Sequence, residues 1–227
     1  MKNTDNGLLL FKTNYSESSL IITFYTESQG LRKYIFKGAK KKKLPIMAFG
    51  NYEINSYKRP ESELGIINSM VISTPYLSSV SHPLKVLISF FISDVLRQTL
   101  REEQGDPQLF HFLTQSAEEL NETKQLSTFP LEFLVKLIEH LGVSPKTIKN
   151  ATHFNMLEGT FSSNGKAPCT EEEELVDYLN SLFTTCLAPP KEFEKEAMLV
   201  LLKYMQLHLP LFDTSRSLAI IKEVLYS

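Results

Sequence analysis

The spacing of apolar and polar residues changes once along this chain of 227 residues, near residue 75. Before that point, short segments rich in β-branched and aromatic residues alternate with turn-forming residues, a pattern typical of β-strands. The pattern predicts five strands: Leu8–Thr13, Leu20–Thr26, Leu31–Lys37, Tyr52–Tyr57 and Ile66–Ser73. Because no helix-length spacer separates them, we expect a small closed barrel, which leaves no sheet edge exposed, and an OB-type barrel is the leading candidate.

From Pro83 onward the apolar residues recur every three or four positions, which is the period of amphipathic helices. Capping and terminating residues then predict six helices: 83–100, 107–120, 131–141, 175–183 after a capping box at 170–173, 190–208 and 214–226. The less regular stretch from 146 to 168 is expected to hold a small hairpin at Phe154–Phe161. The sequence thus predicts an α+β protein, with a five-stranded OB-fold barrel at residues 1–78 followed by an all-helical domain at residues 79–227.

Two local features of the barrel can be predicted in more detail. Residues 27–30 are expected to form a hairpin turn, because the glycine that ends this segment tolerates a positive φ angle. Along the third strand, Tyr34 and Phe36 share one face, whereas Lys33 and Ile35 lie on the other. Alternate positions of a barrel strand fill the barrel interior, so we expect Tyr34 and Phe36 in the core.

The net charge of −2 conceals two parts of opposite charge. Residues 1–75 hold 11 Lys and Arg against 6 Asp and Glu, a net charge of +5, whereas residues 76–227 hold 13 against 20, a net charge of −7. Lysines in a loop neutralise phosphates whatever the base sequence. We therefore expect the barrel to bind nucleic acid, with Lys2, Lys58 and Arg59 as weaker candidates. The principal candidates are Arg32, Lys33, Lys37, Lys40, Lys41, Lys42 and Lys43.

The sequence contains no constellation typical of an enzyme. Phosphate-binding loops, zinc-protease helices and nucleophile elbows are absent, and no two of the five histidines stand four residues apart. Cys169 and Cys186 have no further thiol or histidine at ligand spacing, so neither a zinc site nor a disulfide framework is expected. No apolar run reaches the roughly 18 residues that a membrane-spanning helix needs. We expect no catalytic residue, metal, cofactor, small-molecule substrate or membrane contact.

Several segments resemble the bacterial RecO family of recombination mediators. Residues 14–23 (NYSESSLIIT) are similar to the family's YGESSLILT segment, and residues 30–43 are similar to its GR...VAKGARR.KS segment. Residues 59–65 (RPESELG), 129–142 and 204–218 resemble, in the same order, its RP.SELG, F...LL..LGF and Y...HLP...RSL segments. The resemblance covers nearly the whole chain, and the family's OB barrel and helical bundle agree with the organisation predicted from the residues.

The resemblance implies a non-catalytic DNA-repair protein of the RecF recombination pathway, located in the cytoplasm and associated with the nucleoid during repair. Such proteins bind single- and double-stranded DNA, anneal complementary strands and form a complex with RecR. They also contact the acidic C-terminal tail of the single-stranded-DNA-binding protein, and with these partners they help load the RecA recombinase onto DNA coated by that protein. Many relatives carry a four-cysteine zinc site in the helical domain, whereas this chain has only Cys169 in that neighbourhood, so zinc is not carried over.

An acidic tail with an aromatic end needs an apolar pocket with a basic rim, so the few cations of the acidic helical domain are candidates. Lys136, in the helix that resembles the family's tail-binding region, is the first choice, and Arg97, Arg101 and Lys203 are alternatives. Two other classes of protein stay open. One is an RNA-binding OB module with a helical protein-interaction domain, because a barrel and lysines alone do not distinguish RNA from DNA. The other is a scaffold whose lysines only keep the barrel soluble.

Overall fold

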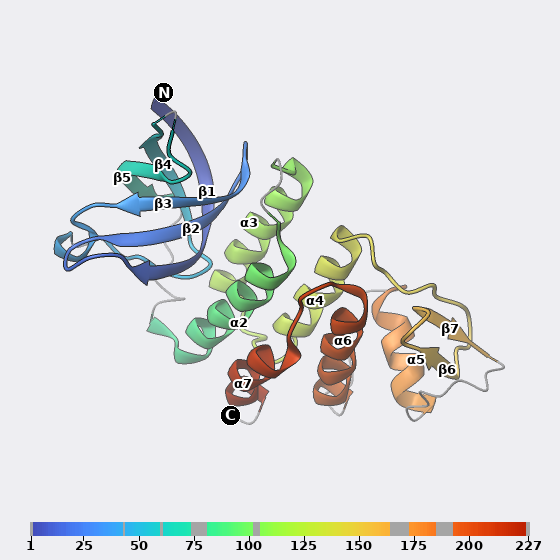
Figure 1. Cartoon of the computed structure of the whole chain (residues 1–227). Helices are drawn as coiled ribbons and strands as arrows, with labels where there is room; N and C mark the ends of the chain where they lie inside the picture. The colour runs from blue at the N-terminus through green and yellow to red at the C-terminus, as the bar shows by residue number, and fades with distance from the viewer. Residues whose placement is uncertain are drawn as a thin grey trace. The chain divides into compact units, whose positions relative to one another are not determined.

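The computed structural model describes residues 2–42, 44–59, 61–73, 81–101, 105–163, 173–184 and 193–225 (Figure 1). The chain forms two compact units, Met1–Lys124 and Gln125–Ser227. In the described ranges, the first unit contains a five-stranded barrel and two α-helices, and the second contains four α-helices and a two-stranded sheet.

Five strands close the barrel in the order β1-β2-β3-β5-β4. β3 and β5 pair in parallel, and every other neighbouring pair is antiparallel. This arrangement confirms the predicted OB fold. The strands are β1 (Lys2–Asn14), β2 (Leu20–Thr26), β3 (Gly30–Phe36), β4 (Asn51–Tyr57) and β5 (Gly65–Ile72), with a 3-10 turn, η1 (Ala39–Lys41), between β3 and β4.

The first strand begins at Lys2, earlier than its apolar pattern predicted. Residues 2–8 pair antiparallel with residues 57–51 of β4, so backbone hydrogen bonds hold a segment whose polar composition concealed it. The carboxylate of Asp5 accepts hydrogen bonds from the hydroxyl and the backbone N–H of Ser28. This contact joins the beginning of β1 to the β2–β3 turn, where Gly30 takes the expected positive φ of 69°.

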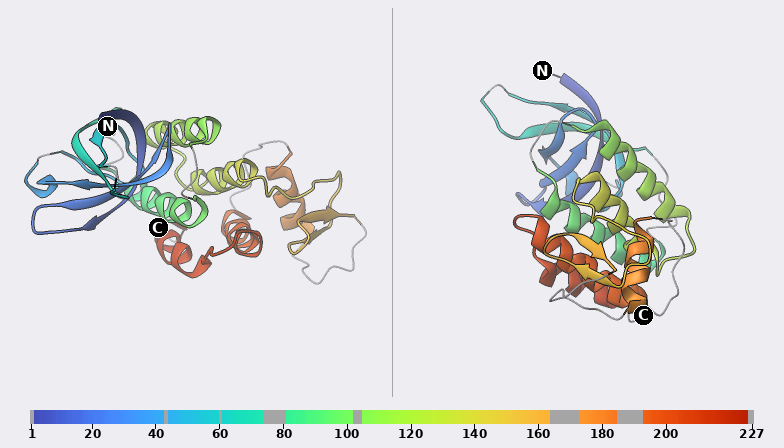
Figure 2. Two further views of the ribbon diagram at one scale, coloured as in Figure 1. Left: turned by 45° about the horizontal axis from the view of Figure 1, so that its top comes forward. Right: turned by 90° about the vertical axis from the view of Figure 1, so that its right-hand side faces the viewer.

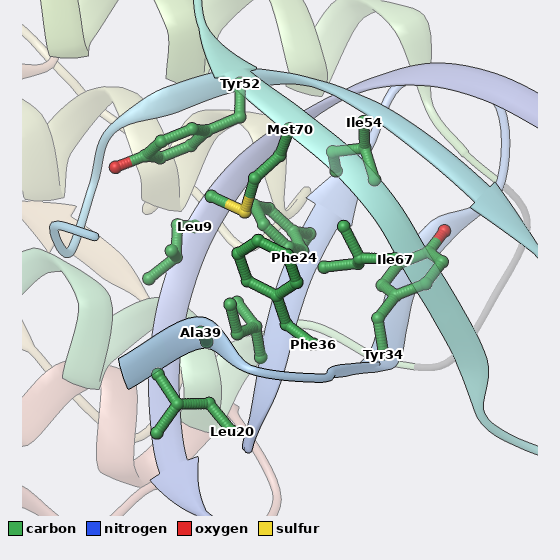
Figure 3. Packing of buried hydrophobic residues seen from close by; sticks show 11 residues of the cluster. Leu9, Leu20, Phe24, Tyr34, Phe36, Ala39, Tyr52, Ile54, Ile67 and Met70 are labelled. Carbon is green, nitrogen blue, oxygen red and sulfur yellow. The ribbon is translucent and has the colours of Figure 1, made fainter. Parts of the chain in front are cut away.

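The barrel interior is one cluster of apolar side chains contributed by all five strands (Figure 3). The rings of Tyr34 and Tyr52 pack edge-on against Phe24, each with a centroid separation of 6.0 Å. Tyr34 and Phe36 are both buried, which confirms the prediction from strand alternation. The other members of the cluster are Leu9, Leu20, Ile22, Ala39, Ile54, Ile67 and Met70.

Helix α2 (Pro83–Thr99) packs against β1. Leu9 points into the barrel core, whereas its neighbour Leu8 is buried on the opposite side of the strand. Leu10, at a bulge in the pairing of β1 with β2, is buried as well. This strand therefore has apolar residues on both faces, which is the pattern of a strand covered on both sides.

Helix α3 (Pro107–Glu122) begins beside the β2–β3 turn of the same unit. The carboxylate of Asp106 caps the helix, as predicted, by accepting hydrogen bonds from two backbone N–H groups of its first turn. The backbone N–H of Asp106 in turn donates to the hydroxyl of Tyr25 at 3.3 Å. Gly105 lies so close to the turn that a Cβ there would stand 2.3 Å from the carbonyl oxygen of Glu27, so only glycine permits this approach.

Helices α2 and α3 thus belong to the same compact unit as the barrel. The predicted domain boundary between residues 78 and 79 lies outside the described residues and stays a prediction. The compact units divide later, between Lys124 and Gln125.

Helix α6 (Glu194–His208) packs against the other three described helices of the second unit. These are α4 (Phe129–His140), α5 (Glu173–Leu182) and α7 (Thr214–Leu225). The helices lie where the apolar spacing predicted them. The predicted capping box before α5 lies outside the described residues, apart from Glu173. None of the helices in the described ranges is both long and apolar enough to cross a membrane.

The second unit is not helical throughout, since β6 (His153–Asn155) and β7 (Thr160–Ser162) form a hairpin within the stretch predicted for one. The rings of Phe154 and Phe161 stack with their centroids 4.2 Å apart. Tyr204 of α6 lies against Phe154 at 5.7 Å, and α5 contacts β6 (Figure 2). Aromatic packing therefore attaches the hairpin to the helices of this unit.

Candidate nucleic-acid interface

The lysine-rich segment after β3 folds into a tight turn that holds its charged side chains outside the barrel. Gly38 has a φ of 67°, and the side chain of Ala39 is buried in the barrel core. The backbone N–H groups of Lys41 and Lys42 donate to the carbonyls of Gly38 and Ala39, each at 3.1 Å. Lys43 lies outside the described residues. The exposed cations of this segment, hereafter the lysine turn, are Lys37, Lys40, Lys41 and Lys42.

The lysine turn packs against the loop between β1 and β2, residues 15–19, at one end of the barrel (Figure 1). Lys40 makes two contacts there: its backbone N–H donates to the carbonyl of Ser18 at 3.2 Å, and its ammonium donates to the carbonyl of Ser16 at 3.0 Å. The ammonium of Lys42 lies 4.4 Å from the centroid of the Phe36 ring, a cation–π contact. The contacts of Lys40 thus hold one of the four cations beside a loop that OB folds use to bind nucleic acid, and Lys42 lies over a ring of β3.

Other predicted cations surround a pocket of about 360 Å³ near the beginning of β3. Arg32, Lys33 and Lys58 line this cationic pocket, together with the acid Glu63. The guanidinium of Arg32 is oriented by two hydrogen bonds, one to the preceding carbonyl at 2.8 Å and one to the side-chain oxygen of Gln29 at 3.4 Å. The pocket therefore combines an arginine whose guanidinium is held by hydrogen bonds with two exposed lysines.

The structure thus places the predicted cations in two groups, one near each end of β3. Lys33 and Lys37 are four residues apart, a separation of about 13 Å along an extended strand. Arg59 is exposed and directly follows Lys58 of the cationic pocket. Lys2 is the first residue of β1 and pairs with Tyr57, the last residue of β4. A nucleic-acid strand lying along β3 would reach both groups.

The aromatic residues of β3 do not offer free ring faces. The ring of Tyr34 lies between Phe24 and Gly65, where an added Cβ would stand 2.5 Å from the ring, and Phe36 is buried. Among the barrel residues that the structure describes, the exposed aromatic side chain is instead Tyr15, at 58% exposure in the β1–β2 loop. The sequence analysis did not single it out, although an aromatic residue within a polar segment between two strands was the available signal.

Two family models together match almost the whole chain. The model described as Recombination protein O N terminal matches residues 1–76, and the one described as Recombination protein O C terminal matches residues 81–217. The chain belongs to the recombination protein O family. The proteins named DNA repair protein RecO from Christiangramia forsetii and Flavobacterium psychrophilum are 28% and 29% identical to it, each over 96% of this chain and 97% of the relative. A relative of the same name from Enterococcus faecalis is 24% identical over 62% of this chain and 55% of its own length.

Membership of the recombination protein O family confirms the resemblance inferred from the sequence segments. The five barrel strands fall within the N-terminal model, and helices α2 to α6 fall within the C-terminal model. The family is described as one of recombination proteins, and the relatives are named as DNA-repair proteins. The two cationic groups therefore lie in the part of the chain that the N-terminal family model covers.

The four cations predicted to bind a partner's tail lie in different compact units of this family member. Lys136 of α4 and Lys203 of α6 are exposed in the second unit, on two helices that contact each other. Arg97 and Arg101 belong to the first unit. The guanidinium of Arg97 is already engaged, because it donates to the carboxylate of Asp94 at 3.0 Å. The four candidates thus form two pairs, Lys136 and Lys203 in the second unit and Arg97 and Arg101 in the first.

The expectation that this chain lacks a zinc site stays a prediction. In the described ranges, no group of three or more His, Cys, Asp and Glu side chains is placed to hold a metal, and both cysteines lie outside those ranges. The β6–β7 hairpin is instead held by the stacked rings of Phe154 and Phe161. In addition, the Nε2 of His208 donates to the carbonyl of Met156 at 2.7 Å.

Proposed function

We propose that this chain is a non-catalytic recombination mediator that binds single- and double-stranded DNA through its barrel. One observation supports this most directly: four exposed lysines gather in a single turn, one of which contacts an OB loop, in a chain of a DNA-repair family. Lysine contacts to phosphates supply affinity that does not depend on base sequence. The cations proposed to carry it are the lysine turn with Lys43, extended by Arg32, Lys33, Lys58 and Arg59.

Annealing of complementary strands follows from the same chemistry. Two strands repel each other through their phosphates, and a surface with two separate cationic groups neutralises part of that charge on both. The lysine turn is open to solvent, whereas Arg32, Lys33 and Lys58 line a concave pocket. We propose that the turn and the pocket hold backbone segments while the bases stay free to pair.

The salt dependence of DNA binding tests the role of the lysine turn. If about five phosphates are neutralised on a single strand, a log–log plot of affinity against salt has a slope near −3.5, from roughly −0.7 per contact. Replacing the four lysines of the turn with alanine is expected to weaken binding at low salt and to flatten the slope by up to about 2.8. A variant with the same loss of charge, at exposed lysines elsewhere, serves as the control: Lys124→Ala, Lys146→Ala, Lys149→Ala and Lys222→Ala.

Two outcomes would contradict this assignment. Equal slopes for the wild type and the lysine-turn variant would remove the turn from the interface, and equal losses in both variants would reduce the effect to net charge. Parallel titrations with a single-stranded RNA of the same length separate the proposed DNA-repair role from RNA handling. A clear preference for RNA, without annealing of DNA, would favour the RNA-binding alternative.

The partners belong to the same proposal. We propose that the chain forms a complex with RecR, binds the acidic tail of the single-stranded-DNA-binding protein and assists RecA loading. Lys136 and Lys203 are proposed for the tail, because they are exposed on contacting helices. In a fluorescence-anisotropy titration with the tail peptide, Lys136→Glu is expected to weaken binding, whereas Lys149→Glu, at another exposed lysine of the second unit, leaves it unchanged. Unchanged binding by Lys136→Glu would exclude Lys136.

An annealing assay combines the DNA and partner proposals. Complementary strands coated with intact single-stranded-DNA-binding protein are expected to anneal faster in the presence of this chain. Strands coated with the same protein lacking its acidic tail are expected to show a smaller acceleration. Equal acceleration in both cases would remove the tail from the proposal but leave the DNA-binding role intact.

A further inference from the structure

The exposed aromatic residue of the barrel is next in sequence to a residue that contacts the lysine turn. Tyr15 is 58% exposed and directly precedes Ser16, whose carbonyl accepts the hydrogen bond from the ammonium of Lys40 at 3.0 Å. The backbone of Tyr15 therefore lies next to the residue that contacts Lys40 of the lysine turn, at the same end of the barrel. Single-strand binding sites combine two components: cations that follow the phosphate backbone, and exposed aromatic rings on which bases stack.

The loop that carries Tyr15 is held in one conformation by its own hydrogen bonds. The backbone N–H groups of Tyr15 and Ser16 both donate to the carbonyl of Ser19, at 3.1 and 3.2 Å. The N–H of Ser19 donates back to the hydroxyl of Ser16 at 3.2 Å. With the two bonds from Lys40, this network fixes the backbone at the base of the Tyr15 side chain. The backbone position of Tyr15 relative to the lysine turn is thus set before a ligand arrives, which lowers the entropic cost of ordering the loop on binding.

The other aromatic rings nearby are already packed. Tyr34 lies between Phe24 and Gly65, and the Phe36 ring is buried beneath the ammonium of Lys42. A phosphate backbone presents negative charge in both single strands and duplexes, so lysines alone select neither strongly. An exposed ring, by contrast, stacks only on a base that is not already stacked in a duplex.

We infer that Tyr15 is a base-stacking platform that gives the lysine turn its preference for single-stranded over duplex DNA. This inference rests on the proposed function, since it takes the lysine turn as the phosphate-binding element. The lysines neutralise the backbone and Tyr15 stacks on one unpaired base beside it. Tyr15 thereby becomes a specificity-determining residue of the same surface.

The inference is tested by a thermodynamic cycle of binding measurements, in which Tyr15 is mutated in the protein and the bases are removed from the DNA. The probes are a deoxythymidine oligomer of about 12 nucleotides, within the range of one OB fold, and an abasic backbone of the same length and charge. Tyr15→Ala is expected to weaken binding to the oligomer by about 5- to 150-fold, the range for loss of one stacked base, and to leave abasic and duplex binding within about 2-fold. Tyr15→Phe keeps a ring and is expected to bind all three probes as the wild type does.

The outcomes separate this inference from the proposed function. If the wild type shows salt-dependent binding to the abasic backbone, but Tyr15→Ala binds the oligomer as tightly as the wild type, stacking by Tyr15 is overturned and the lysine turn stands. An equal loss on the oligomer and the abasic backbone also overturns it, because the mutation then acts on the backbone contact. If the wild type binds none of the probes in a salt-dependent manner, the proposed function itself is overturned.

Discussion

The ammonium group of Lys85, near the beginning of α2, donates a hydrogen bond to the carbonyl oxygen of Asn121, near the end of α3, at 2.6 Å. The last carbonyls of a helix have no partner within the helix and carry its partial negative charge. Lys85 is buried, so its charge is brought to this helix end inside the first compact unit. The contact ties together the two helices that follow the barrel.

Replacing Lys85 with methionine is expected to destabilise the protein. Methionine retains much of the apolar stem but has no donor for the carbonyl of Asn121. Hydrogen bonds to charged groups contribute about 1.5–3 kcal/mol, so the free energy of unfolding in urea should fall by about that amount. Lys124→Met, at an exposed lysine of the same unit, should change it by no more than about 0.5 kcal/mol. Equal effects of the two substitutions would exclude the contact as a source of stability.

Two buried tyrosines of the second unit should respond in opposite ways to loss of the hydroxyl. The hydroxyl of Tyr204 donates to the carbonyl of Val143 at 2.7 Å, whereas the hydroxyl of Tyr178 is buried without a hydrogen-bond partner among the described residues. At pH 7, Tyr204→Phe should lower the free energy of unfolding by about 1 kcal/mol, and Tyr178→Phe should leave it unchanged or raise it. A larger loss from Tyr178→Phe than from Tyr204→Phe would contradict the assignment.

Stability should fall in alkaline solution, partly through Tyr178. Burial, and then the carboxylates of Glu194 and Glu132, raise the pKa of Tyr178 above its usual value near 10. The folded state therefore keeps this proton while the unfolded state loses it, so the contribution to stability is complete below pH 10 and is lost as pH rises beyond it. Urea unfolding at successive pH values from 9 to 11 should show a decline that Tyr178→Phe makes shallower. An identical decline in both proteins would exclude this tyrosine as a cause.

The β6–β7 hairpin should depend on its aromatic stack and not on a metal. Phe161→Ala removes one of two rings stacked 4.2 Å apart and should lower the free energy of unfolding by about 3–5 kcal/mol. Phe161→Leu retains most of the apolar volume and should cost less. Because the stack involves no metal ligand, incubation with a chelator should leave Tm unchanged. A marked fall in Tm after chelation would show that a metal contributes to the fold.

Apolar periodicity predicted most of this fold because burial of apolar side chains positions most of its elements. β2 has its predicted bounds, and Tyr34 and Phe36 lie in the core as alternation required. The beginning of β1 escaped prediction because residues 2–7 are mostly polar and are held by backbone pairing with β4. Such pairing depends on a partner about 50 residues away in the sequence, which no local pattern contains.

The candidate site was predictable in composition but not in arrangement. The lysine run was visible as charge, yet only the chain path shows that Arg32 and Lys33 line a pocket while Lys40 packs on the β1–β2 loop. Tyr15 stood in a polar segment between two predicted strands, which was a signal, but its exposure depends on how the β1–β2 loop folds, which the sequence pattern does not contain. Charge density therefore identified the surface, and the tertiary structure separated its two groups.

The buried apolar residues of β1 that lie outside the barrel core determine the smallest fragment of this chain that we expect to fold without aggregating, for example when fused to another protein. A fragment cut after the last barrel strand would expose Leu8 and Leu10 to water, and exposed apolar strips of this kind promote aggregation. It would also lose the contact between Gly105 and the β2–β3 turn. A fragment that ends at Lys124 keeps both, so the transferable module of this protein is the barrel together with its first two helices.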